Sequence, residues 1–159
     1  MRPDKNQLLA SLKEAYRDVL GEISHRIGVT PKHIDRLIPT TGDGEMVAAM
    51  IGIRGSRIQV TTSVIADKAV VGGIYAEAYA ALLGKTLDDE TALFGEFADR
   101  LTEAALTKAG VTELSATPAQ IMEGQNFKNV PSNKSAISSF SMPFELPEGM
   151  LYINLALHV

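Results

Sequence analysis

The sequence predicts a single α+β domain, in which one antiparallel sheet carries long helices on one of its faces. Three stretches in the first two thirds of the chain have apolar residues at helical spacing, whereas the last third alternates as strands do. Short turn-like segments separate neighbouring strands, which favours antiparallel pairing. We therefore expect one domain over residues 1–159 with a single, mostly antiparallel sheet of roughly six strands.

Composition limits the class of protein. Of 159 residues, 45% are hydrophobic and 21% are charged, and the net charge is −4 without a Lys/Arg cluster. This balance is typical of globular proteins and argues against nucleic acid as a partner. There is no cysteine, the N-terminus is charged, and the apolar runs are too short for a membrane span, so we expect a cytoplasmic protein. Because His25, His33 and His158 lack metal-ligand spacing, we expect no metal site.

The first predicted helix covers residues near 5–27, where apolar side chains recur at helical spacing with charged residues between them. Gly28 is expected to end it. A brief strand is expected around Ile34, Leu37 and Ile38, before a glycine-containing turn.

A β-hairpin and a second helix are predicted next. Residues 46–53 are almost entirely apolar and residues 58–64 alternate, with a turn at Arg54-Gly55-Ser56 between them. Residues 66–83 are rich in alanine and predict a helix. Gly72-Gly73 inside it costs about 1–2 kcal/mol relative to alanine, which indicates close packing or a kink at that point.

The third predicted helix begins after Thr86, whose hydroxyl is expected to cap it, and Gly110 ends it. Acidic residues follow Thr86, where the helix dipole favours negative charge. Three strands complete the chain, and the last two form a hairpin through the Pro147-Glu148-Gly149 turn. These strands are expected at residues 117–123, 135–144 and 150–158.

The third helix has two different faces. At about 100° per residue, Glu96 and Asp99 emerge from neighbouring turns on the side opposite the apolar stripe, with Arg100 beside them and no cation directly on the strip. A solvated charged face is one interpretation, and a pair of carboxylates presented to a partner is the other. The apolar stripe is expected to face the core and comprises Leu93, Phe94, Phe97, Leu101, Ala104 and Ala105.

Residues 88–100 resemble the active helix of the CheC/CheX/FliY family of chemotaxis phosphatases, which carries an E-x-x-N motif. The resemblance continues in the hairpin at residues 46–64, in the Pro-bearing segment 117–119 and in the closing hairpin, so that about residues 8–159 follow the family's plan. Some members of the family carry a second motif of this kind on the first helix, but this chain does not. In this respect the chain resembles the CheX-like branch of the family. That resemblance implies a homodimer paired through sheet edges.

The resemblance also implies a function, the hydrolysis of phosphoaspartate on a CheY-like response regulator in chemotaxis signalling. Glu96 matches the acid of the motif, to which the family assigns binding of the partner's active-site lysine. Asp99 stands where the family has Asn, the residue that orients the attacking water. The Mg²⁺ belongs to the partner's receiver domain, so the resemblance implies no cofactor bound by this chain. Positioning and electrostatics then account for the rate.

Asp99 departs from the motif in its chemistry. An amide both donates to a phosphoryl oxygen and accepts from water, whereas an ionised carboxylate only accepts. At about 5 Å and an effective dielectric constant of ~20, the carboxylate repels the phosphoryl group by roughly 3 kcal/mol, about a hundredfold in rate. It is, however, the better proton acceptor for water. A phosphatase and a receiver-binding module without activity are therefore both compatible with the sequence. A small-molecule-binding domain, the third class considered, needs a polar-lined pocket that the sequence does not indicate.

Overall fold

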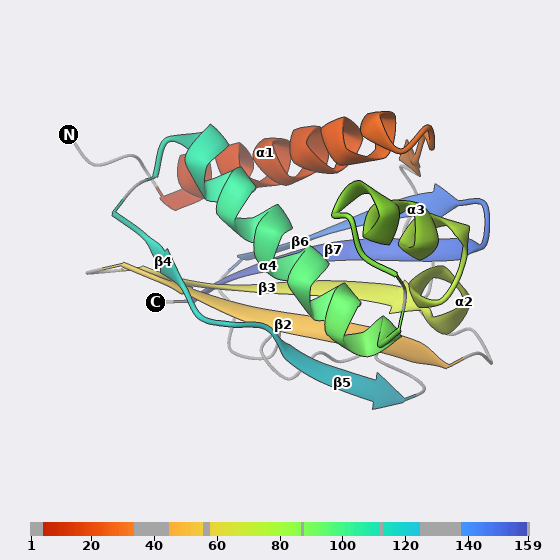
Figure 1. The fold of residues 1–159 in the computed structure, drawn as a ribbon. Coiled ribbons are helices and arrows are strands. Elements are labelled where there is room, and N and C mark those ends of the chain that lie inside the picture. The colour runs from red at the N-terminus through yellow and green to blue at the C-terminus, as the bar shows by residue number, and fades with distance from the viewer. Residues whose placement is uncertain are drawn as a thin grey trace.

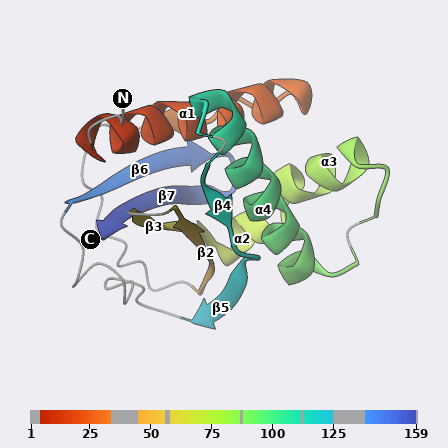
Figure 2. The same ribbon diagram turned by 90° about the vertical axis from the view of Figure 1, so that its left-hand side faces the viewer.

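A computed structural model shows one antiparallel sheet beneath a layer of helices (Figure 1 and Figure 2). This is the α+β fold that the sequence predicts, with the long helices on one face of the sheet. The structure describes residues 5–33, 45–55, 58–86, 88–111, 113–124 and 138–158. The elements are α1 (Lys5–Arg26), β1 (Lys32–His33), β2 (Met46–Arg54), β3 (Gln59–Asp67), α2 (Lys68–Val71), α3 (Ile74–Leu82), α4 (Glu90–Ala109), β4 (Ser115–Ala116), β5 (Gln120–Gly124), β6 (Ser138–Leu146) and β7 (Gly149–His158).

Within the described chain the sheet has seven strands in the order β1-β6-β7-β3-β2-β4, and β5 also pairs with β2. All the pairings are antiparallel. β4 and β5 pair with successive parts of β2, because Arg54 lies opposite Ser115 whereas Met50 lies opposite Gln120. The two short strands thus share one position at the sheet edge, and the prediction of about six strand positions is confirmed.

Both predicted hairpins are confirmed. β2 and β3 pair along their full length of nine residues each, and Gly55 N donates to Ile58 O at 3.0 Å at their turn. β6 and β7 pair up to Leu146 opposite Gly149, so their turn contains only two residues. The brief strand expected around Ile34, Leu37 and Ile38 lies outside the described residues, as do residues 135–137 of the strand expected at 135–144.

The helix expected at residues 66–83 is interrupted. β3 extends into its first two residues, α2 spans only four residues, and α3 begins after Gly72 and Gly73. A Cβ atom at Gly73 would lie 2.5 Å from the carbonyl oxygen of Ala69 and 2.8 Å from Cγ of Glu148. The close packing inferred from the two glycines is confirmed, and the kink is a complete break between two helices.

The cap of α4 differs from the one predicted. Asp89 Oδ1 accepts from Ala92 N at 3.1 Å, and the helix begins at the next residue, Glu90. Thr86 lies earlier, in the connection, where its hydroxyl donates to Asp88 at 3.0 Å, so the expected Thr86 cap is wrong. The predicted end at Gly110 is confirmed, because its φ of 72° lies in the left-handed region that glycine adopts without steric cost.

The core lies between the helices and the sheet, and the strand residues that face it are buried. It includes one polar junction, where the Tyr16 hydroxyl lies 2.9 Å from both Thr62 Oγ1 and Thr102 Oγ1. These three fully buried residues come from α1, β3 and α4, so the hydrogen bonds join two helices to the sheet. Alternate residues of β7 face this core, and Leu151, Ile153, Leu155 and Leu157 are all buried.

The sheet face away from the helices also contains apolar packing. Tyr152, on the face of β7 opposite Leu151 and Ile153, is only 4% exposed and packs with Met46, Ala48 and Ile65 in a second, smaller cluster. The partly buried Met50, Met122 and Met150 pack against this cluster. Among the described residues, none of the helices combines the length and the apolar character that a membrane crossing requires.

Candidate functional site

α4 runs obliquely across the sheet, and its buried side fixes how the helix is rotated (Figure 1). The ring of Phe97 meets Tyr79 edge-to-face, with centroids 5.1 Å apart, and Tyr75 in the same manner at 6.0 Å. Ala104, expected in the apolar stripe, is exposed, and Leu106 is buried instead. The large side chains and alanines that α4 buries are Leu93, Phe94, Phe97, Ala98, Leu101, Ala105 and Leu106.

Glu96 and Asp99, the two residues predicted for the site, lie on the outer half of α4. Both are partly exposed, and the Glu96 side chain keeps 29% of its surface accessible. The intervening Phe97 and Ala98 are buried. Because residues three apart emerge from neighbouring turns of a helix, the two carboxylates are accessible together from outside the molecule.

Glu96 is paired with two cations. Lys85 Nζ lies 3.0 Å from Oε2 and 3.2 Å from Oε1, and Arg100 Nη2 lies 3.1 Å from Oε1. Hydrogen bonds from Lys85, and secondly from Arg100, hold the pKa of the Glu96 carboxyl below its ordinary value against the opposing effect of burial. Glu96 is therefore ionised at neutral pH. The expectation of no cation directly on this strip is wrong, because Lys85 occupies it.

The backbone at the end of α3 positions Lys85. Gly84 adopts a φ of 71°, and Lys85 N donates to Ala80 O at 2.8 Å across the last helical turn. This arrangement is a common C-terminal helix motif, and it fixes the direction of the chain after the glycine. Lys85 is thus held at a defined place between α3 and α4, from which its side chain reaches Glu96.

Asp99 is anchored to the sheet edge. Its Oδ1 accepts from Ala119 N at 2.9 Å, in the connection between β4 and β5. The same connection is tied to β2, since Thr117 N donates to Gly52 O at 2.8 Å and Thr117 Oγ1 accepts from Gly52 N at 3.0 Å. Oδ1 of Asp99 is therefore occupied by a backbone hydrogen bond. This bond fixes the position of the Asp99 carboxylate relative to the sheet edge.

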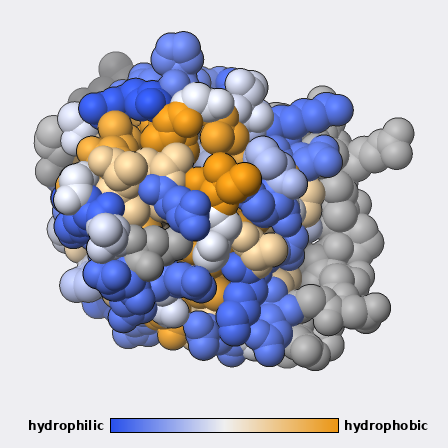
Figure 3. Space-filling model, turned by 45° about the vertical axis from the view of Figure 1, so that its right-hand side comes forward, coloured by the Kyte–Doolittle hydropathy of each residue, from blue (hydrophilic) through white to orange (hydrophobic). Residues whose placement is uncertain are grey.

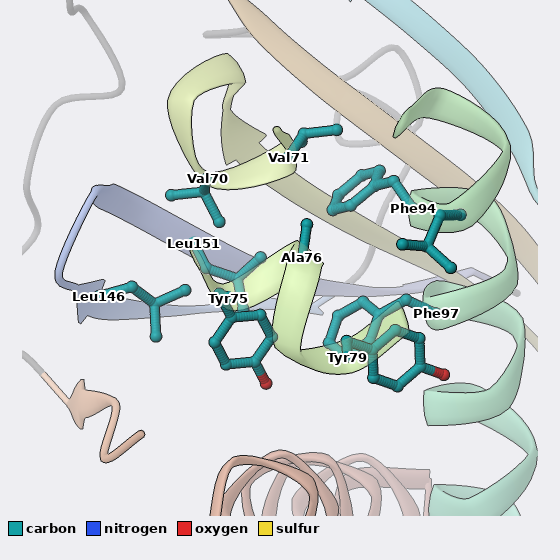
Figure 4. A pocket seen from close by; sticks show the side chains of 10 residues that line it. Val70, Val71, Tyr75, Ala76, Tyr79, Phe94, Phe97, Leu146 and Leu151 are labelled. Carbon is teal, nitrogen blue, oxygen red and sulfur yellow. The ribbon is translucent and has the colours of Figure 1, made fainter. Parts of the chain in front are cut away.

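A small apolar cavity lies between α2, α3, α4 and the β6–β7 hairpin (Figure 4). Its volume is about 30 Å³. The Tyr75 hydroxyl points away from it and lies 2.9 Å from Ser24 Oγ. Because the lining is apolar, this cavity is not the polar-lined pocket that a small-molecule-binding domain needs. The lining residues are Val70, Val71, Tyr75, Ala76, Tyr79, Leu93, Phe94, Phe97, Leu146 and Leu151.

A larger groove of about 770 Å³ lies on the helix layer between α1, α3 and α4. Figure 3 shows the side of the molecule that lies on the right in Figure 1, where α3 is found. On this side, apolar side chains are bordered by hydrophilic ones. Leu82 and Leu83 of the α3 end line this groove together with charged residues of α1 and α4. Arg100 lines it as well, so the groove adjoins the Glu96 ion pair.

In the described part of the chain, no three His, Asp or Glu side chains are grouped as a metal site would require.

The fold and the site define a class of protein: an antiparallel sheet covered on one face by helices, one of which presents two carboxylates on its outer side. Neither a family model nor a curated protein sequence matches the chain. Solved structures match over nearly the whole length.

Three solved structures show the likeness. A CheC-like superfamily protein from Shewanella sp. PV-4 has a TM-score of 0.73 at 17% identity, covering 94% of this chain and 98% of that one. The chemotaxis protein CheX from Vibrio vulnificus has a TM-score of 0.67 at 16% identity, covering 99% and 100%. The CheX of the CheX–CheY–BeF₃–Mg²⁺ complex from Borrelia burgdorferi has a TM-score of 0.59 at 21% identity, covering 99% and 100%. The chain therefore has the fold of the CheC/CheX/FliY family, as the sequence resemblance implied.

Proposed function

We propose that this protein acts in chemotaxis signalling as a cytoplasmic phosphatase of a phosphorylated CheY-like response regulator. The observation that carries the proposal is the accessible pair Glu96 and Asp99, presented on neighbouring turns of a helix whose other side is fixed in the core. The likeness to a CheX solved in complex with CheY supports a receiver domain as the partner.

In this proposal the two carboxylates have different roles. Glu96 binds an ammonium group of the receiver, which its ionised state at neutral pH favours. Asp99 Oδ1 is occupied by Ala119 N, so Oδ2 is the oxygen that orients the attacking water and accepts its proton. The receiver supplies the Mg²⁺ and the aspartyl phosphate, and this chain contributes position and charge without a cofactor of its own.

A receiver-binding module without activity is the second candidate. It is favoured by the observation that both carboxylates are already engaged, Glu96 by two cations and Asp99 by a backbone N–H. Such a module would compete for the receiver without hydrolysing its phosphate.

Phosphate release separates the two candidates. The protein is incubated with a Mg²⁺-loaded, phosphorylated CheY-like receiver from the same cell, and inorganic phosphate is followed over time. We expect acceleration, and we expect Glu96→Gln to weaken receiver binding by about tenfold, equivalent to ~1.4 kcal/mol. Glu103→Gln, an exposed acid on the same helix, is the matched control and should behave as the wild type. Absence of acceleration at saturating receiver would leave the binding module.

A homodimer paired through sheet edges belongs to the same proposal. The strand at this edge of the described sheet is β1, which pairs with β6 at Phe144 and Glu145, and we place the contact between the two copies at a sheet edge. Light scattering of the purified protein should give the mass of two chains, and a monomeric mass would reject the dimer.

A further inference from the structure

The charges around the site are balanced by residues that the family motif does not contain. Lys85 and Arg100 both pair with Glu96, while Asp99 lies one turn further along the same side of α4. Two cations therefore stand beside two carboxylates. Arg100 approaches Glu96 from the same helix, whereas Lys85 approaches from the α3–α4 connection.

A cation from a partner that binds Glu96 competes with these two. Arg100 contacts Oε1 through both Nε and Nη2, at 3.2 and 3.1 Å, a geometry that holds its planar group in place. Lys85 holds Glu96 through a single ammonium on a flexible stem. Its side chain is 53% exposed and that of Arg100 is 55% exposed, so the flexible stem, and not exposure, distinguishes Lys85 as the cation that exchanges. Since exposed ion pairs of this kind are weak, an incoming ammonium replaces Lys85 at little net cost.

We propose that Lys85 is the exchangeable counter-ion of this site: it neutralises Glu96 in the free protein, and when the ammonium of a phosphorylated receiver takes Glu96, Lys85 turns to the receiver's anionic phosphoryl group beside Asp99. The inference rests on the proposed docking of a receiver on α4. The flexible stem lets the released ammonium move while the backbone of Lys85 stays fixed by the motif at Gly84. Lys85 then offsets the repulsion between the Asp99 carboxylate and the phosphoryl group.

The structure offers a matched control for this role. Lys68 is also 53% exposed and also pairs with a carboxylate at 3.0 Å, but it belongs to α2 and its partner is Glu45. Lys85→Met and Lys68→Met therefore remove the same charge and one exposed ion pair each. Lys85→Arg keeps the charge at the site.

The test measures the affinity of each variant for a CheY-like receiver, with and without Mg²⁺ and beryllofluoride, the phosphoryl mimic. We expect Lys85→Met to weaken binding of the activated receiver by about three- to tenfold and to leave binding of the unactivated receiver unchanged or slightly tighter. Lys85→Arg and Lys68→Met should both retain the affinity of the wild type for the activated form. In an Asp99→Asn background the loss caused by Lys85→Met should shrink, because the repelling carboxylate is gone.

The outcomes distinguish this inference from the function on which it rests. The wild-type protein could prefer the activated receiver while Lys85→Met and Lys68→Met bind it with the same affinity. That result would overturn the role of Lys85 and leave receiver docking intact. An equal loss from Lys85→Met with and without Asp99→Asn would also overturn it. Wild type that binds neither form of the receiver would remove the proposed function, and the role of Lys85 with it.

Discussion

The hydrogen bond from Ala119 N to Asp99 Oδ1 constrains what a substitution at Asp99 does. An asparagine has one acceptor oxygen and one donor NH₂ group on the same amide. Because Ala119 N can only donate, the amide oxygen must face it, and the NH₂ group is directed to the position that Asp99 Oδ2 now holds. The fold would therefore fix the orientation of an amide at position 99, with its oxygen on Ala119 N and its NH₂ group in the place of Oδ2.

We predict that Asp99→Asn raises the rate of phosphate release from the receiver. The substitution removes the repelling charge and adds a donor for a phosphoryl oxygen, so a gain of about tenfold to a hundredfold is expected at saturating receiver. Asp99→Ala is the control, since it loses the bond to Ala119 as well as the charge. Its melting temperature should fall, while that of Asp99→Asn should stay near the wild type. An unchanged or lower rate in Asp99→Asn would show that the carboxylate acts as the base for water.

At the scale of helices and strands, the sequence predicts best what local chemistry determines. The hairpin turns and the helix end at Gly110 depend on residues within a few positions of each other, and they are confirmed. At Gly72 and Gly73 the sequence predicts close packing or a kink within one helix, whereas the structure has two separate helices, α2 and α3. One contact at this break comes from Glu148, which is distant in the sequence and lies against Gly73 only once the β6–β7 hairpin has packed.

The break between α2 and α3 leads to a prediction about stability. Gly73→Ala should lower the free energy of unfolding by about 1–3 kcal/mol, because the added Cβ would lie 2.5 Å from the backbone oxygen of Ala69. Gly21→Ala is the matched control: Gly21 lies within α1, and a Cβ there meets nothing within 4 Å. It should stabilise the protein by about 0.5–1 kcal/mol through helix propensity. Urea unfolding measures both, and a Gly73→Ala variant as stable as the wild type would contradict the close contact.

At the scale of the whole molecule, the predicted fold class and the two candidate acids could be found from pattern and resemblance, but their surroundings could not. Lys85 and Ala119 contact the acids only because α3, α4 and the β4–β5 connection come together in the tertiary structure. A lysine after a helix-ending glycine is common, so Lys85 gives no signal in the sequence. The same holds for Tyr16, whose buried hydroxyl is recognisable as a junction only when Thr62 and Thr102 are placed beside it.

Buried tyrosines, Tyr16 and Tyr75 among them, make the stability of the whole domain sensitive to alkaline pH. Burial raises the pKa of Tyr16 to about 12 and that of Tyr75 to about 12, from an ordinary value of 10.0. In the unfolded chain both hydroxyls ionise near the ordinary value, whereas in the folded protein they keep their protons. The stability that this difference provides is complete below pH 10 and is lost as the pH rises towards 12.

We therefore predict that the free energy of unfolding falls above about pH 10, by as much as ~1.4 kcal/mol per pH unit for each of the two tyrosines. Tyr16→Phe should make this fall shallower, because one of the titrating tyrosines is removed. At about pH 8 the same variant should be less stable than the wild type by ~1–3 kcal/mol, since Thr62 and Thr102 lose their shared partner. Chemical unfolding at several pH values tests both effects, and an unchanged alkaline slope in Tyr16→Phe would contradict the assignment of Tyr16 as one of the groups responsible.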